Sequence, residues 1–228
     1  LLRSISHDLR TPLTSISGYA ELIENGMAKQ EDIPTFGHRI HKEAQRMITL
    51  VSDILQLSEL DGMSKQQENS PTADFVPVDL GVLVKDVATN MTVNARKAYI
   101  TLQYKVQPVT VRGSHDLLTE LVTNLCDNAI KYNVDGGSVA IHVSRKGDNA
   151  CVTVSDTGIG IPEEDQKHIF ERFYRVDKAR SRESGGTGLG LSIAQEILNQ
   201  HKGSIEISSE YGKGTSVLIT MPAAEAQA

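Results

Sequence analysis

The chain has 228 residues, of which 39% are hydrophobic, 23% are charged and only 4% are aromatic, a composition typical of a soluble protein of one or two domains with an aliphatic core. Its net charge of −6 argues against a nucleic-acid-binding protein that neutralises many phosphates. Because an apolar run of about 18 residues, a signal peptide and an initial methionine are all missing from the sequence, we expect a cytoplasmic portion of a longer protein.

The first apolar pattern in the chain is heptad-like and predicts two helices. The first is expected to end near Asn25-Gly26, and Pro34 suits the first turn of the second. Each apolar stripe is wider than a two-stranded seam, so a single hairpin cannot bury both. We therefore predict an all-α helical hairpin that pairs with a second copy into a dimeric four-helix bundle. The repeating positions are Leu2, Leu9, Ile16 and Ile23 in the first helix and Ile40, Met47 and Ile54 in the second.

Residues 62–77 are polar, contain two prolines and predict a linker between two domains. Beyond the linker, helical and alternating patterns follow one another and predict an α/β domain in which three helices cover a sheet of about five strands. The predicted helices are 79–98, 116–132 and 189–201, and the predicted strands are 99–106, 138–147, 149–158 and a closing hairpin at 203–222.

The two cysteines, Cys126 and Cys151, are too far apart in sequence for a CxxC metal or redox site. We expect two buried thiols in a reducing compartment. Cys126 in particular is expected only to pack.

The stretch "SHDLRTPL" holds the first candidate for chemistry. The heptad pattern places His7 at the most solvent-facing position, with Thr11 one turn further on the same face. A carboxylate at Asp8 can approach a ring nitrogen, fix the tautomer and make the other nitrogen a better nucleophile. Pro12 has no N–H for the Asp8 carbonyl, so we expect the helix to bend there. This pattern is typical of a phospho-accepting histidine, although an exposed histidine without function is the alternative.

Two glycine-rich stretches and an asparagine pair lie downstream. "SDTGIGIP" places Asp156 at a strand end, and "SGGTGLGLSIAQEI" is a glycine-rich loop that runs into a helix whose N-terminus can hold phosphates. Asn124 and Asn128 lie on one helix face, where an amide oxygen can complete a Mg²⁺ shell, and Lys131 follows one turn later. Each feature alone is also compatible with a surface turn or a solvated lysine.

Five motifs together resemble those of sensor histidine kinases of two-component systems, in the order found in that family and over residues 1 to 222. They are "SHDLRTPL" (H box), "NLCDNAIKY" (N box), "DTGIGIP" (first G box), "FERFYR" (F box) and "GGTGLGL" (second G box), and "GKGT" at 212–215 resembles a sixth. The resemblance implies a dimerisation and histidine-phosphotransfer hairpin at 1–62, a linker at 63–77, a Bergerat-type ATP-binding domain at 78–222 and a tail at 223–228. Residues 6–23 are also similar to the phosphate-responsive branch of the family.

The resemblance implies a role for each matching residue. His7 is expected to be phosphorylated, Asp8 to activate it as general base, and Thr11 to position water for dephosphorylating a partner. Asn128 is expected to bind Mg²⁺, and Asp156 to accept the adenine amino group. The other expected ATP-binding residues are Asn124, Lys131 and Tyr132 on the N-box helix, Gly158 and Gly160 in the adenine pocket, Arg175 near the γ-phosphate, and Thr187, Gly188, Leu189 and Gly190 in the lid.

The resemblance also implies the reaction and the partners. ATP and Mg²⁺ would support autophosphorylation of His7, followed by transfer to an aspartate of a response regulator, with a further phosphatase activity toward that regulator. We expect a homodimer, no nucleic acid, and attachment to the bacterial cell membrane only through segments absent from this chain. One departure is His201-Lys202-Gly203, where the family usually has two glycines after the histidine; we assign it no functional cost.

Three alternatives share part of this pattern. A Bergerat-fold ATPase without a phosphohistidine, such as a chaperone or mismatch-repair ATPase, would use a glutamate like Glu120 to activate water, but it has no need of the His7-Asp8 pair. A dimeric scaffold that only binds nucleotide would usually have lost His7, Asn128 or Asp156. A serine-directed kinase of this fold would lack the phosphoacceptor hairpin.

Overall fold

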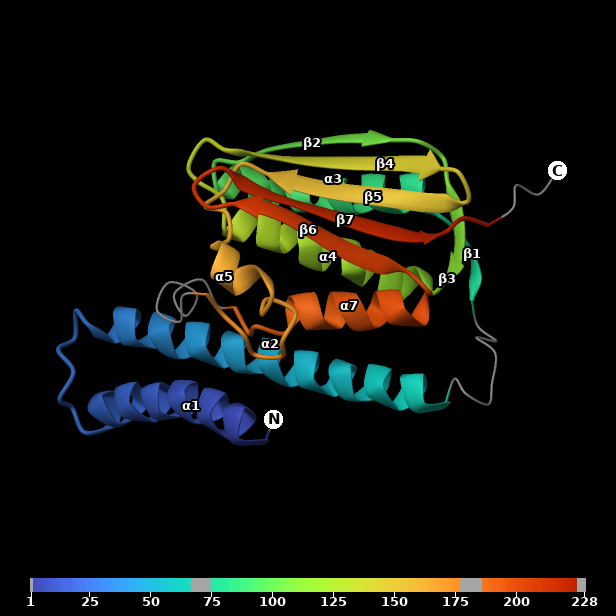
Figure 1. The fold of residues 1–228 in the computed structure, drawn as a ribbon. Helices are drawn as coiled ribbons and strands as arrows, with labels where there is room; N and C mark the ends of the chain where they lie inside the picture. Colours follow the sequence, from blue (N-terminus) through green and yellow to red (C-terminus); the bar gives the residue numbers. More distant parts are fainter. Residues whose placement is uncertain (1, 67–74, 177–185, 225–228) are drawn as a thin grey trace.

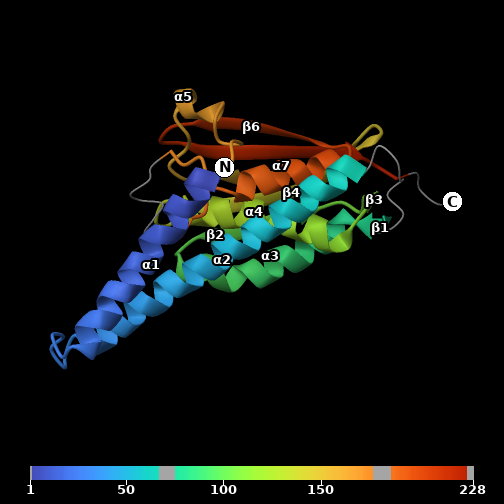
Figure 2. The same cartoon turned by 90° about the horizontal axis from the view of Figure 1, so that it is seen from below.

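The computed structural model describes residues 2–66, 75–176 and 186–224. A helical hairpin of α1 (Leu2–Glu24) and α2 (Ile33–Gln66) is followed by an α/β domain. Figures 1 and 2 both show α1 beside α2, and α2 running along α7 (Gly190–Gln200) of the α/β domain. None of the described helices is both long and apolar enough to cross a membrane.

Helix α1 is continuous through Pro12, which is buried. Because Pro12 cannot donate to the Asp8 carbonyl, the backbone lacks one helical hydrogen bond there. One residue earlier in the ladder, the Thr11 hydroxyl donates to the His7 carbonyl at 3.3 Å. The helix ends as predicted, since Gly26 adopts a φ of 65° just beyond it, a conformation that glycine accepts without strain.

Helix α2 has 34 residues, carries Pro34 in its first turn as predicted and continues four residues past the boundary expected at residue 62. Three of its leucines are buried against the α/β domain: Leu50, Leu57 and Leu60 are 4%, 5% and 1% exposed. Another face of the same helix stays open, with Ile48 and Leu55 57% and 60% exposed. The helix therefore carries two apolar faces, of which this chain covers one.

The α/β domain is built as the sequence predicts. The five-stranded sheet has the order β2-β4-β5-β7-β6, with β2 parallel to β4 and the other neighbours antiparallel. The three helices α3, α4 and α7 cover one face of this sheet (Figure 1). The bounds are α3 (Leu80–Lys97), β2 (Thr101–Val106), α4 (His115–Lys131), β4 (Ser138–Lys146), β5 (Asn149–Asp156), α5 (Glu163–Gln166), β6 (Ser204–Glu210) and β7 (Gly214–Pro222).

The core between the helices and the sheet is aliphatic. Fully buried side chains come from α3, α4, the sheet and α7, and include Leu80, Leu121, Ile141 and Ile197. Both cysteines are free and buried, as predicted. Burial raises the pKa of the Cys126 thiol to about 12, so this side chain stays protonated and packs as a small apolar group.

Some local structure was not predicted. β1 (Val76–Asp79) and β3 (Thr110–Gly113) form a separate antiparallel pair, each too short to show an alternating pattern. The strand expected from residue 99 begins at Thr101, because Tyr99 lies in a turn with a φ of 57°. Lys202, which stands where the family usually has glycine, also adopts a positive φ of 54°, a conformation that strains a side chain with a Cβ.

A buried histidine links three elements of the α/β domain. His201 is 5% exposed, and its Nδ1–H donates to the Ile197 carbonyl at 2.7 Å while Nε2 accepts the Ser114 N–H at 3.2 Å. Its ring stacks on Phe75 with centroids 4.4 Å apart. Both ring nitrogens are thus used by the neutral form, and burial lowers the pKa of His201.

This histidine predicts a loss of stability in acid. Because its pKa is lower in the folded state, the unfolded chain binds more protons between that pKa and about 6.5, so stability is full above this range and falls as pH decreases through it. The slope contributed by one such group is at most about 1.4 kcal/mol per pH unit. Urea unfolding of wild type, His201→Gln and the exposed-histidine control His142→Gln at several pH values between neutral and mildly acidic should give the smallest pH slope for His201→Gln. Equal slopes for all three proteins would contradict the prediction.

Candidate functional site

The phosphoacceptor candidate lies on the open side of α1. The His7 side chain is 66% exposed, as its heptad position predicts, and its Nδ1 lies 3.1 Å from Oδ1 of Asp8, whose side chain is 27% exposed. The carboxylate can accept a hydrogen bond from Nδ1–H and so fix the tautomer with an unprotonated Nε2. Thr11 is exposed one turn away, but its hydroxyl bonds the His7 backbone rather than the ring.

A cavity of about 330 Å³ lies between α4, β5, the start of α7 and α2, a volume within the usual range for small-molecule sites. Ten of the predicted ATP-binding residues line it. These are Asn124, Asn128, Lys131, Tyr132, Asp156, Gly160, Arg175, Thr187, Gly188 and Gly190. Two others do not line it: Gly158 is buried beside the Tyr132 backbone, and Leu189 is fully buried in the core.

One end of the cavity is organised by Asp156 at the end of β5. Its Oδ1 accepts the N–H of Gly158 at 2.8 Å and the N–H of Thr215 at 3.2 Å. Burial raises the pKa of this carboxyl, and the two backbone hydrogen bonds oppose the shift. The carboxylate is thus held in one orientation at the floor of the pocket.

The glycines of the first G box are required by close backbone contacts. A Cβ on Gly158 would lie 2.3 Å from the carbonyl oxygen of Tyr132. Gly160 has a φ of 66°, and its Cβ would lie 2.1 Å from the Glu210 carbonyl oxygen. Any larger residue at either position would force the end of β5 away from α4 or from the β6–β7 hairpin. Asp156, which lies at that end of β5, would then be displaced.

The other end of the cavity collects the groups suited to phosphates. Gly190, the first residue of α7, lies opposite Asn124 and Asn128, so that an added Cβ would stand 4.0 Å from both amides. The first turn of α7 contains no acidic residue, which leaves the positive end of its dipole uncompensated. Burial lowers the pKa of Lys131, and the nearby carboxylate of Asp127 partly offsets this.

Two further lining residues, Thr49 and Asp53, come from α2 and were not predicted. Thr187 donates from its hydroxyl to Oδ2 of Asp53 at 2.6 Å and accepts the Leu189 N–H at 3.3 Å. Burial raises the pKa of Asp53, and the Thr187 hydrogen bond and the charge of Lys131 oppose the shift. A signal was present in the sequence, because Asp53 is a polar residue within the apolar stripe of α2.

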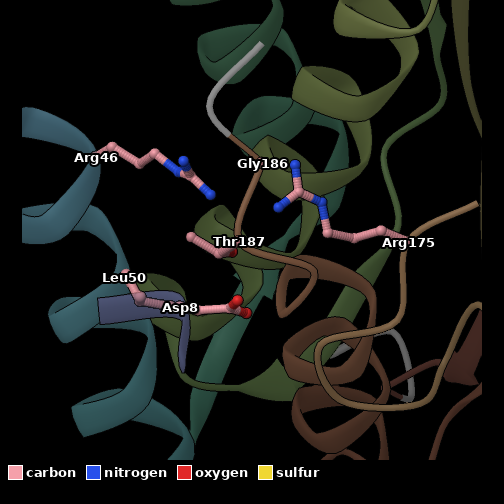
Figure 3. Close-up of a pocket in the computed structure, with 6 residues that line it drawn as sticks. All are labelled: Asp8, Arg46, Leu50, Arg175, Gly186 and Thr187. Carbon is pink, nitrogen blue, oxygen red and sulfur yellow. The ribbon is translucent and has the colours of Figure 1, made fainter. Parts of the chain in front are cut away.

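A second, smaller pocket lies between the hairpin and the α/β domain. Figure 3 shows the Asp8 carboxylate and the guanidinium groups of Arg46 and Arg175 projecting toward the space beside Thr187. Leu50 and Gly186 complete its wall. The H box, although 180 positions away from the second G box in sequence, therefore borders the same space as Thr187.

The polar contacts along α2 also fix Glu120. Its carboxylate accepts a hydrogen bond from the Gln56 amide, and burial raises its pKa. Glu120 is not among the residues that line the large cavity. It thus lies at the contact between α2 and α4, and it is not placed to activate water at a nucleotide, as the ATPase alternative requires.

Comparisons with known proteins agree with this arrangement. A family described as the His Kinase A (phospho-acceptor) domain matches residues 1–62, and a family of histidine kinase-, DNA gyrase B- and HSP90-like ATPases matches residues 113–225. The sensor protein kinase WalK of Staphylococcus saprophyticus is 38% identical over 222 residues, which cover 96% of this chain and 35% of that protein. The chain belongs to the protein-histidine kinases of two-component systems.

Solved structures show the same fold. The structure of full-length ShkA in complex with AMPPNP matches this histidine kinase with a TM-score of 0.70 and 26% identity, over 100% of this chain and 46% of that one. Histidine kinase ThkA in complex with the response regulator protein TrrA matches with a TM-score of 0.76 and 22% identity, over 98% of this chain and 61% of that one. The chain spans about a third of the length of WalK from S. saprophyticus.

The contact between Thr187 and Asp53 predicts how the lid of this histidine kinase is held. Asp53→Ala removes the acceptor, and loss of a hydrogen bond to a charged group costs about 1.5–3 kcal/mol. We expect amide hydrogen exchange at residues 187–190 to become faster in Asp53→Ala. In Asp53→Asn, whose amide oxygen can still accept from Thr187, exchange should stay close to wild type. Equal exchange rates in wild type and Asp53→Ala would contradict this prediction.

Proposed function

We propose that the kinase domain transfers the γ-phosphoryl group of ATP to Nε2 of His7. The observation that carries this proposal is the contact between His7 Nδ1 and Asp8 Oδ1 beside a pocket that Thr187 and Arg175 of the ATP-binding domain also line. With Nδ1 as donor to the carboxylate, Nε2 keeps its lone pair. The bond from Nε2 to phosphorus forms as the bond from phosphorus to the bridging oxygen breaks. ADP leaves, and Asp8 takes the Nδ1 proton.

ATP fits the large cavity in one orientation. Asp156 Oδ1 is already engaged with two backbone N–H groups, so Oδ2 is the oxygen that can accept the adenine amino group. Apolar residues suited to an aromatic base line the same end: Ile159, Ile161, Ile169 and Val217. The triphosphate then extends toward Asn124, Lys131 and the N-terminus of α7, where positive charge and backbone donors are available.

Mg²⁺ would be held at the phosphate end of the cavity jointly by the chain and the nucleotide. Asn128 supplies an amide oxygen there, a ligand that Mg²⁺ accepts alongside water and phosphate oxygens. Within the described residues no group of three or more His, Cys, Asp or Glu side chains is placed to hold a metal ion, so most ligands would come from the nucleotide and water. The ion would neutralise charge on the phosphates, while the chain orients the nucleotide and the acceptor.

We further propose that His7 passes its phosphoryl group to an aspartate of a response regulator, and that Thr11 positions the water that hydrolyses the resulting aspartyl phosphate in a phosphatase reaction. The exposure of His7 and Thr11 supports docking of a partner at this face. The related fold of ThkA in complex with the response regulator protein TrrA supports such a partner.

We also propose that the chain forms a homodimer and that the full-length protein is bound to the membrane. Large apolar side chains that this chain leaves exposed on the hairpin support pairing with a second copy: Leu13, Ile48, Val51 and Leu55. The greater length of the WalK relatives supports additional segments in the complete protein. We also propose that the protein belongs to the phosphate-responsive branch of the family, because residues 6–23 are similar to that branch. The WalK relatives support membership of the family but not of that branch.

The phosphoacceptor assignment predicts the outcome of a labelling experiment. Incubation with Mg²⁺ and ATP labelled at the γ-phosphate should give a protein-bound label that is labile in acid and stable in alkali, because a phosphoramidate hydrolyses in acid. The label should be lost in His7→Gln, while binding of a fluorescent ATP analogue is retained. Hydrolysis of ATP without protein label, unchanged in His7→Gln, would overturn the proposal and favour the ATPase alternative.

The role of Asp156 predicts a selective loss of nucleotide binding. In Asp156→Asn, the amide oxygen can still accept from Gly158 and Thr215, but an N–H₂ group then faces the adenine amino group. Replacing an acceptor by a donor should cost about 1.5–3 kcal/mol, which is about 10–100-fold in the ATP dissociation constant. Isothermal titration calorimetry should detect this loss, with the thermal midpoint nearly unchanged and the exposed variant Asp148→Asn binding as wild type. A wild-type dissociation constant in Asp156→Asn would contradict the role.

A further inference from the structure

The small pocket between the hairpin and the ATP-binding domain is formed by a single chain. Its walls come from α1 and α2 on one side (Asp8, Arg46 and Leu50) and from the segments around Arg175 and Thr187 on the other. The Asp8 carboxylate in this pocket is 3.1 Å from the His7 ring. The lid end of the ATP-binding domain therefore meets the acceptor helix of its own chain.

Contacts along α2 hold the domain in this position. In the middle of α2, Asp53 accepts a hydrogen bond from the Thr187 hydroxyl at 2.6 Å. Near the C-terminal end of α2, Arg172 forms two hydrogen bonds with Asp61, at 2.6 and 2.8 Å. Asp53 and Asp61 are eight residues apart, or about 12 Å along a helix, so the two contacts fix both the position and the direction of the domain on α2.

Further contacts to α2 lie close to Asp53 and Asp61 in sequence. Gln200 of α7 donates to the Leu60 carbonyl at 3.2 Å, and the leucines at 50, 57 and 60 are almost fully buried. Sliding the domain along α2 by one helical turn would break the Arg172–Asp61 ion pair and the Thr187–Asp53 hydrogen bond. It would also expose the three buried leucines of α2. The register that these contacts define is the one that brings Thr187 and Arg175 beside Asp8.

The charges in the pocket suit a transferring phosphoryl group. Arg46 comes from the hairpin and is only 13% exposed, and Arg175 comes from the ATP-binding domain. Both guanidinium groups project toward the space that Asp8 borders (Figure 3). Guanidinium groups hold the equatorial oxygens of phosphate well, and in this pocket the two parts of one chain each contribute one.

We infer that autophosphorylation runs in cis: the ATP-binding domain of each chain phosphorylates His7 of that same chain. This inference rests on the proposed kinase activity and specifies its acceptor. The contacts with α2 keep the ATP-binding domain close to its own His7, so the acceptor is present at a high effective concentration. In this register the domain borders Asp8 of its own chain, so transfer to a second chain would need another placement of the domain.

Heterodimers with two different affinity tags test the inference. One pairs His7→Gln, which lacks the acceptor, with Asp156→Asn, which is expected to bind ATP about 10–100-fold more weakly. The ATP concentration is kept near the wild-type dissociation constant, so that Asp156→Asn stays largely empty. The other pairs wild type with the double variant His7→Gln/Asp156→Asn. Each is co-expressed, purified over both tags and incubated with Mg²⁺ and ATP labelled at the γ-phosphate. The wild-type homodimer is the reference: if it carries no label on His7, the kinase proposal itself fails.

Cis transfer gives label in the second heterodimer only, at about half the level of wild type, since one of two chains is competent. Trans transfer gives the opposite pattern, with label in the first heterodimer only, and would overturn the inference. If purification over both tags recovers no heterodimer, a dilution series of wild type decides instead. A labelling rate per chain that stays constant down to concentrations at which light scattering shows monomers supports cis transfer, and a rate that falls as the dimer dissociates overturns it.

Discussion

The packing of α2 against the ATP-binding domain is the contact on which the functional arrangement depends. Leu50, Leu57 and Leu60 are almost fully buried there, and burying a leucine side chain is worth about 1.5–3 kcal/mol. The ion pair between Asp61 and Arg172 is about one-third exposed on both sides, where such pairs contribute about 0.2–1 kcal/mol. The leucines thus provide most of the free energy of docking.

The polar contacts have a different effect from the leucines. Asp53 would be costly to bury alone, but Thr187 satisfies one of its oxygens at 2.6 Å. In an undocked state, water would replace that bond, so the pair adds at most the net value of a hydrogen bond to a charged group, about 1.5–3 kcal/mol. Misplacing the domain along α2, however, would leave a buried carboxylate without its donor. The Asp53–Thr187 pair therefore reinforces the register in which the leucines are buried.

Much of this architecture could be predicted because each element has a local signal. The heptads of α1 and α2, the stop at Gly26 and the three helices on a five-stranded sheet all follow from periodicity and turn residues. Motif spacing identified ten of the residues that line the large cavity. Glycines at 160 and 188 are part of these motifs because the backbone there has a positive φ and leaves no room for a Cβ. Such requirements are local and leave a readable pattern.

What could not be predicted depends on contacts distant in sequence. The β1–β3 pair has four residues in each strand and too little alternation to recognise. Thr49 and Asp53 line the cavity only because α2 lies against the ATP-binding domain. In the same way, Arg46 meets Arg175 near Asp8 only in the docked arrangement. No sequence pattern gives the relative position of two domains joined by a linker.

The two pockets differ in how much the hairpin contributes to their lining. Most residues that line the large cavity come from α4, β5 and the start of α7, and Asp156 is held there by two backbone N–H groups without help from the hairpin. The residues around the acceptor come from both domains, and they converge only while the leucines of α2 stay covered. In the proposed reaction, nucleotide binding therefore depends on local geometry, whereas phosphoryl transfer depends on docking. A change at the α2 contact should alter the rate of transfer more than the affinity for ATP, which is how a signal carried along the hairpin can control the reaction without changing the nucleotide site.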